Sequence, residues 1–140
     1  MHSRPESQAT TRAFARIIGP YVFIVTCIIV IRAPQMNVLL ASFFESPIIV
    51  WLMGALLLFG GLLIIAHHQY WKAPTAIMIS LFGWFLGLRG LTLLAAPQLI
   101  ECGAAASMSA MPLVRIGFGV LSLVGLWFTY VGWIAKPKDV

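Results

Sequence analysis

Long apolar runs separated by short polar stretches dominate this sequence. The first run extends from Ile17 to Ile31 and is framed by Arg16 and Arg32. Three longer runs follow, at about residues 47–66, 75–96 and 112–134. An α-helix rises 1.5 Å per residue, so about 20 apolar residues cross the hydrocarbon core of a bilayer, which is about 30 Å thick. The pattern therefore predicts four transmembrane helices.

The first run is the shortest, because 15 residues rise only about 22 Å. A helix that starts near Thr11 is longer, and both flanking arginines can reach the headgroups along their aliphatic stems. We therefore place the first span at residues 13–32, after a polar N-terminal tail at residues 1–12. The four spans make one domain, residues 13–135, and residues 136–140 form a cytoplasmic C-terminal tail.

Two of the connections between spans are longer than a turn. Residues 97–111 are rich in Ala and Ser and are assigned as a plain connection. The other connection, residues 33–46, has apolar residues at helical spacing, which predicts a short helix lying in the membrane interface. These residues are Met36, Leu39, Leu40, Phe43 and Phe44.

The composition agrees with a membrane protein. Apolar residues make up 61% of the chain and charged residues 9%, and the mean hydropathy is +0.97. Soluble domains carry about 25% charged residues. So few charges cannot cover a surface that faces water. The fold class predicted is an all-α membrane protein, a bundle of four transmembrane helices.

The basic residues predict the orientation. The net charge is +5, and the cations of the two ends and of the central turn outnumber those of the other loops. The other two loops carry Glu45 and Glu101, with Arg32 and Arg115 at their edges. The positive-inside rule therefore places both termini in the cytoplasm. Because no basic stripe with interleaved aromatics occurs, nucleic acid is not an expected partner. The end and turn cations are Arg4, Arg12, Arg16, Lys72, Lys136 and Lys138.

The two halves of the chain resemble one another, which suggests an internal repeat. Ala-Pro-Gln follows the first span at residues 33–35 and the third span at residues 96–98. Duplication predicts two helical hairpins related by a pseudo-twofold axis along the membrane normal. Chance similarity between apolar segments rich in Gly and Pro is the alternative. After a two-residue slip the matched pairs are Pro47 with Pro112, Gly54 with Gly119 and Gly60 with Gly125.

Arg89 is the polar residue that function is most able to use. It lies fourteen residues into the third span, and an arginine at the centre of a span costs about 2.5–3.5 kcal/mol on insertion scales. One interpretation is a polar site for an anion or a lipid headgroup, formed with Glu101 and Arg115. The other is a structural arginine whose side chain reaches the outer interface.

Small residues form a stripe on each of the last two spans. Such stripes let transmembrane backbones approach closely, so we interpret them as helix-packing surfaces. A substrate groove is the alternative interpretation. The first stripe is Gly83, Gly87 and Gly90, and the second is Ser122, Gly125, Thr129 and Gly132.

The remaining candidate residues favour neither a cofactor nor an enzyme. His67 and His68 are adjacent, so they point about 100° apart on a helix and cannot both bind one ion. We interpret them as interface anchors. Cys27 in a span and Cys102 in a loop are not expected to form a disulfide. No acid lies in the middle of a span, so no proton-coupling or catalytic group is expected there.

Several short motifs resemble an uncharacterised family of small four-span bacterial integral membrane proteins. The resemblance covers about residues 14–100, and it places His68 where relatives often have asparagine. It implies a bacterial cytoplasmic (inner) membrane and a four-helix fold, and it implies no activity. The motifs are Arg16-Ile-Ile-Gly-Pro20, Ser46-Pro47, Ala66-His67 with Trp71, Leu81-Phe-Gly-Trp84 and Pro97.

Two hypotheses for the function follow. The first is a non-catalytic accessory or structural subunit, whose partners are the lipid bilayer and other membrane protein subunits or further copies of itself. The second is a transporter or channel component for a small anion or lipid, with Arg89 in its polar site. No cofactor is expected in either case.

Overall fold

The computed structural model describes residues 5–68, 71 and 74–134, and within these ranges it contains helices and turns but no strand. The four long helices are α1 (Pro5–Ile31), α3 (Pro47–His67), α4 (Pro74–Ala95) and α6 (Met111–Thr129). The shorter ones are the 3₁₀ turn η1 (Ala33–Gln35), α2 (Met36–Phe44), α5 (Pro97–Ser109) and the π-helical turn η2 (Tyr130–Ile134).

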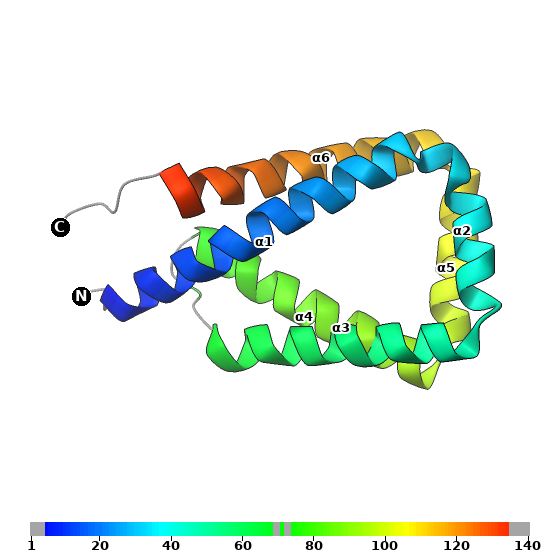
Figure 1. The fold of residues 1–140 in the computed structure, drawn as a ribbon, viewed down its shortest axis with the longest axis horizontal. Helices are drawn as coiled ribbons and strands as arrows, with labels where there is room; N and C mark the ends of the chain where they lie inside the picture. Colours follow the sequence, from blue (N-terminus) through cyan, green and yellow to red (C-terminus); the bar gives the residue numbers. More distant parts are fainter. Residues whose placement is uncertain (1–4, 69–70, 72–73, 135–140) are drawn as a thin grey trace.

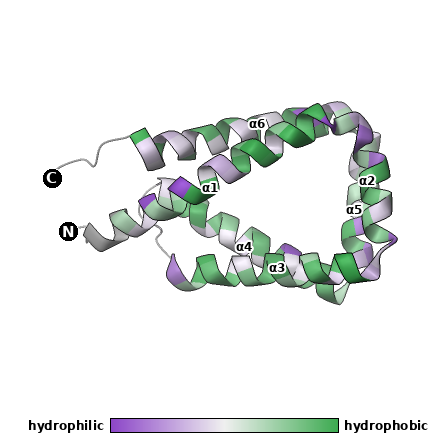
Figure 2. Cartoon of the chain, viewed as in Figure 1, coloured by the Kyte–Doolittle hydropathy of each residue, from purple (hydrophilic) through white to green (hydrophobic). Residues whose placement is uncertain are grey.

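Each long helix has the length and hydropathy needed to cross a bilayer. The candidate spans are Ala9–Ile31, Pro47–His67, Pro74–Ala95 and Met111–Ile134. The protein is therefore an all-α membrane protein with four transmembrane helices, as the apolar runs predict. Hydrophobic residues cover most of the long helices, and hydrophilic ones lie mainly toward helix ends (Figure 2). Large apolar side chains such as Ile17, Leu52, Phe85 and Leu123 stay exposed, as expected of surfaces that face lipid.

The long helices are arranged as two pairs that form a V (Figure 1). α1 packs along α6, and α3 packs along α4. The pairs meet at the end where α1 contacts the start of α4, and they diverge toward the other end, where α2 and α5 lie side by side. α2 and α5 run in opposite directions, and each joins one pair to the other.

This pairing differs from the two hairpins expected from the sequence. The first and second spans, α1 and α3, belong to one predicted hairpin, yet each packs most extensively against a helix of the other half. The short helices explain the difference. α2 has nine residues and is about 13 Å long, which exceeds the separation of roughly 8–10 Å between packed helix axes. It therefore carries the chain from one pair to the other.

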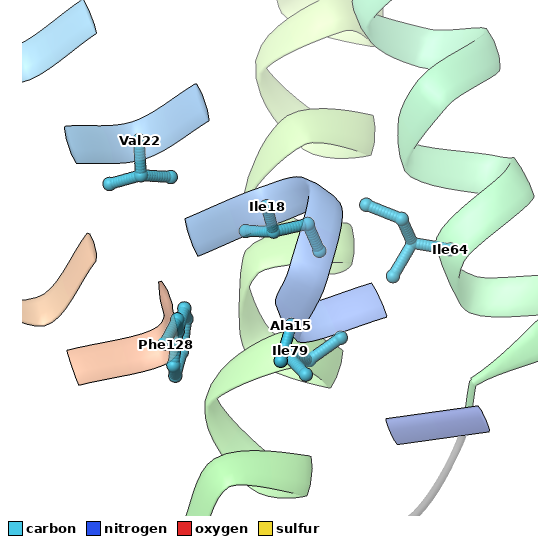
Figure 3. Packing of buried hydrophobic residues seen from close by; sticks show 6 residues of the cluster. All are labelled: Ala15, Ile18, Val22, Ile64, Ile79 and Phe128. Atoms are coloured by element: carbon cyan, nitrogen blue, oxygen red, sulfur yellow. The ribbon is translucent and has the colours of Figure 1, made fainter. Parts of the chain in front are cut away.

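A small apolar cluster closes the end of the V where the pairs meet (Figure 3). Ala15 and Ile79 are 0% exposed and bring α1 against α4. Phe82 and Leu86 of α4 and Val124 of α6 pack against the cluster and are only partly buried. These three side chains therefore lie at the edge of the contact between the two pairs, where the pairs begin to diverge. The buried members are Ala15, Ile18, Val22, Ile64, Ile79 and Phe128.

Two segments differ from the sequence prediction. α1 begins at Pro5, so the part of the expected polar tail at residues 5–12 is helical. The connection at residues 97–111 contains α5, which starts at Pro97. Proline suits the first turn of a helix, where its missing N–H leaves no hydrogen bond unmade, and alanine is the strongest helix former. The predicted tails at residues 1–4 and 136–140 lie outside the described residues.

The helix boundaries of the first half recur in the second half at a constant offset. α1 ends at residue 31 and α4 at 95; η1 starts at 33 and α5 at 97; α3 starts at 47 and α6 at 111. The offset is 64 residues in all three cases, and we refer to it as the repeat interval. The sequence match of Pro47 with Pro112 exceeds it by one position, because proline is the first residue of α3 but the second of α6.

Candidate functional site

The three residues of the predicted polar site lie on three different helices. Arg89 is on α4, Glu101 on α5 and Arg115 near the start of α6, and all three side chains are exposed. Within the described part of the chain, no ion pair or hydrogen bond joins them. Arg89 lies three residues after Leu86 and seven after Phe82, so it continues the stripe of α4 that packs against the central cluster.

The glycine stripe of α4 packs against α3 at main-chain distance. A Cβ placed on Gly61 of α3 would lie 2.6 Å from Gly87 Cα, and one placed on Gly90 would lie 2.8 Å from Leu58 Cα. One on Gly83 would lie 2.7 Å from the Ile64 side chain. Real Cβ atoms are not found this close to a neighbouring main chain. The glycines therefore set the separation of α3 and α4.

The small-residue stripe of α6 and η2 packs in the same way against α1. A Cβ on Gly125 would lie 2.9 Å from Phe23 Cα, and one on Gly132 would lie 3.0 Å from the Ala15 carbonyl carbon. Ser122 and Thr26 share a hydrogen bond of 2.7 Å between their hydroxyls, which joins the two helices within their apolar spans. Such a hydrogen bond contributes about 0.6 kcal/mol inside a membrane protein.

A buried histidine, which the sequence interpretation missed, joins three helices. His68 follows α3 directly and is 0% exposed. Its Nε2 lies 2.9 Å from the Thr11 hydroxyl of α1, and its Nδ1 lies 3.3 Å from the Ser80 hydroxyl of α4. Ser80 donates its proton to the His68 carbonyl at 3.2 Å. The prediction of two interface anchors is therefore wrong for His68, whereas His67 is exposed and contacts the Leu63 carbonyl.

These partners suit a neutral imidazole. Because the Ser80 hydroxyl proton goes to the His68 carbonyl, Nδ1–H of the ring is the donor toward Ser80 Oγ, and Nε2 accepts from Thr11. Burial lowers the pKa of His68 below its ordinary value of 6.5, since a charged imidazolium loses its hydration there. The Phe14 ring packs against it in an edge-to-face arrangement, with ring centroids 5.5 Å apart.

Two arginines of α1 hold the pair of α1 and α6 together, at the end of the molecule where His68 lies. Arg16 Nε donates to the Gly132 carbonyl at 2.8 Å, and Arg12 Nε donates to the same oxygen at 3.2 Å. Trp133 Nε1 donates back to the Arg16 carbonyl at 3.2 Å, and the Arg16 guanidinium lies 5.8 Å from the Trp133 ring centre. The π-helical turn at Tyr130–Ile134 presents the Gly132 carbonyl to α1.

Contacts within the two pairs match at the repeat interval. Gly61 faces the main-chain nitrogen of Gly87, and Gly125 faces that of Phe23. Gly125 follows Gly61, and Gly87 follows Phe23, by this same interval. In contrast, Gly60 and Gly119, members of the pairs matched in the sequence, have open space where a Cβ would be. The matching contacts are thus offset by one residue from the sequence alignment, and one residue on a helix moves a side chain by about 100°.

The polar contacts follow the same interval. Ser80 donates to the His68 carbonyl in one pair, and Arg16 donates to the Gly132 carbonyl in the other. Arg16 precedes Ser80, and Gly132 follows His68, by one repeat interval. A side chain of one helix therefore binds a carbonyl at the end of its neighbour in both pairs, although the residue types differ.

A pocket of about 320 Å³ lies between α2 and α5. Its walls are mainly apolar, and its two polar residues are Asn37 of α2 and Glu101 of α5. The lining residues of each helix recur at i, i+3, i+4 and i+7, so each helix turns one face to the pocket. They are Asn37, Leu40, Ala41 and Phe44 from α2, and Glu101, Ala104, Ala105 and Met108 from α5.

The two cysteines are not paired with each other. Cys27 and Cys102 are both free, and Cys27 Sγ lies 3.5 Å from Ser122 Oγ. Within residues 5–68, 71 and 74–134, no three His, Cys, Asp or Glu side chains gather into a group able to hold a metal ion. Comparison of the chain with models of protein families, with curated proteins and with solved structures finds no match.

Proposed function

We propose that this protein is a non-catalytic accessory or structural subunit of the bacterial cytoplasmic membrane, with both termini in the cytoplasm. In this proposal the chain consists of two copies of one unit, a long helix, a short helix and a second long helix. The recurrence of helix boundaries and of contacts at the repeat interval supports the duplication. The excess of Lys and Arg at the ends and central turn supports the orientation.

The close approach of main chains at Gly61 and Gly125 is the observation that carries the structural role. Packing of this kind makes each helix pair rigid, because dispersion between backbones holds transmembrane helices together. Where the two pairs diverge, Leu86 and Val124 are only partly covered by this chain. Their apolar surface suits a helix of a partner subunit or of a second copy.

Purification from native membranes in mild detergent, followed by mass spectrometry of the intact assembly, tests this proposal. The expected result is a fixed stoichiometry with another membrane protein or with further copies of the chain. A chain that purifies as a monomer accompanied only by lipid would contradict the subunit proposal.

The exposure of Arg89 favours a second candidate function, a transporter or channel component for a small anion or lipid. Within the described ranges its side chain makes no hydrogen bond or ion pair, and it lies beyond the point where the pairs diverge. An arginine within a span commonly marks a polar path or a headgroup contact.

Replacing Arg89 by Gln distinguishes the two candidate functions. As a subunit, the protein should keep its assembly, and its free energy of unfolding should change by no more than about 0.5 kcal/mol, since Arg89 is exposed. Liposome flux and copurified anionic lipid are the measurements, with Arg32→Gln, an exposed arginine outside the predicted polar site, as the matched control. Loss of flux or of bound lipid in the Arg89 variant alone, with assembly intact, would establish the transporter.

A further inference from the structure

The pocket between α2 and α5 has a composition that selects one kind of ligand. Six of its eight lining residues are apolar, and the only charged group among them is the Glu101 carboxylate. Binding sites for small molecules commonly combine apolar walls with a few polar groups that fix the orientation of the ligand, and they start at about 300 Å³. The volume of about 320 Å³ therefore suits a small ligand, such as one aromatic ring with a short side chain.

The antiparallel course of α2 and α5 separates the two polar residues. The two helices run in opposite directions (Figure 1), Asn37 lies in the first turn of α2 and Glu101 lies near the start of α5, so these two residues line opposite ends of the pocket. For the same reason, Phe44 at the end of α2 lies toward the Glu101 end. Leu40, with the alanines of both helices, occupies the middle.

We propose that this pocket binds a small organic monocation, an ammonium group on an apolar body, with Glu101 as its counter-ion. The Glu101 carboxylate is exposed, and the apolar walls beside it lower the local dielectric constant, so its attraction for the cation is stronger than it would be in open water. The Phe44 ring at this end offers a cation–π contact to the same ammonium group. The Asn37 amide supplies a hydrogen-bonding group at the far end.

The charges present favour this ligand over an anion. No basic residue lines the pocket, and the Arg32 guanidinium nearby in the chain is bound to Gln35 Oε1 at 2.9 Å. Glu101 has no ion-pair partner among the described residues. Its charge is therefore available to a ligand. This inference is independent of the subunit proposal, because it concerns a pocket within one chain.

Calorimetric titration of the full-length protein in nanodiscs tests the proposal. The probe is 2-phenylethylammonium, with 2-phenylethanol as a neutral molecule of the same apolar body. The ammonium should bind at least about tenfold more tightly than the alcohol. Glu101→Gln should reduce the affinity for the ammonium at least about tenfold and leave that for the alcohol unchanged.

Two control variants locate the binding. Glu45→Gln removes the other acidic residue of this end, which does not line the pocket, and should leave the affinity within about twofold. Ala104→Phe should fill the pocket and abolish binding, and its folding is checked by thermal unfolding. Equal binding of alcohol and ammonium, an equal effect of Glu45→Gln, or no effect of Glu101→Gln would each overturn the proposal.

Discussion

At the scale of single residues, His68 shows how a polar side chain can link helices without carrying a charge. Its ring contacts hydroxyls from α1 and α4, and its carbonyl accepts from Ser80. A protonated ring would lose its hydration at this buried position, and its Nε2 could no longer accept from Thr11. The neutral form is therefore the one that the fold stabilises.

The first prediction concerns pH. The pKa of His68 is lowered in the folded state, so the unfolded state binds more protons near pH 6, and stability must fall as the pH drops below the ordinary value of 6.5. The stabilisation is present in full above that value. One proton limits the slope to about 1.4 kcal/mol per pH unit. Thermal unfolding in detergent between pH 5 and 8 measures it.

Two asparagine variants isolate the contribution of His68. His68→Asn keeps an N–H donor near the position of Nδ1 but does not titrate, so the pH dependence should become smaller. His67→Asn changes an exposed residue and should keep the dependence of the parent protein. A slope that is unchanged in His68→Asn would show that the proton binds elsewhere.

The sequence predicts little of this residue-scale chemistry. Two adjacent histidines after an apolar run give no periodicity from which to decide which ring is buried. The decisive partner, Thr11, lies in the segment expected to be a tail, and Ser80 lies in another span. Only the fold brings these three residues together. Arg89, by contrast, is visible in the sequence because a charge interrupts an apolar run.

At the scale of helices, hydropathy predicts where the spans lie along the chain. It does not predict which face of each helix packs against a neighbouring helix. All sides of α3 are apolar, so no periodicity marks the side that meets α4. Gly60 and Gly61 are neighbours of the same type, yet only Gly61 lies in the contact. The stripes of small residues at 83–90 and 122–132 can be predicted because they repeat on one face. The helices against which these stripes pack cannot be predicted from the sequence.

The second prediction uses this pair of glycines. Gly61→Ala places a methyl group against the main chain of Gly87, which cannot yield without separating the helices, so the variant should lose about 1–3 kcal/mol of stability. Gly60→Ala adds the same methyl group in open space and should change stability by no more than about 0.5 kcal/mol. Unfolding in mixed micelles with increasing denaturing detergent measures both. Equal losses in the two variants would contradict the packing of α3 on α4.

At the scale of the whole molecule, helices pack across the two halves of the chain. The repeat suggested by Ala-Pro-Gln at residues 33–35 and 96–98 predicts that the two halves are related. Because the sequence alignment contains a two-residue slip, it does not give the exact residue-to-residue correspondence between the halves. Matching Pro47 with Pro112 shifts the alignment by one position relative to the helix boundaries, because Pro47 is the first residue of α3 and Pro112 is the second residue of α6. The helix boundaries and the contacts within the two pairs recur 64 residues apart, and this recurrence supports the duplication proposed above.

Cross-linking in native membranes tests this packing most directly. Cys27 Sγ of α1 lies 3.5 Å from Ser122 Oγ of α6, so Ser122→Cys, in a Cys102→Ser background, should form an internal disulfide with Cys27 after oxidation with copper phenanthroline. Leu58→Cys, in the same background, places a cysteine at the position of α3 that precedes Ser122 by one repeat interval. Mass spectrometry of the monomer band should find the Cys27 link with position 122 and none with position 58. A link to position 58, with none to 122, would show that α1 packs on α3 as a hairpin and would contradict the fold described.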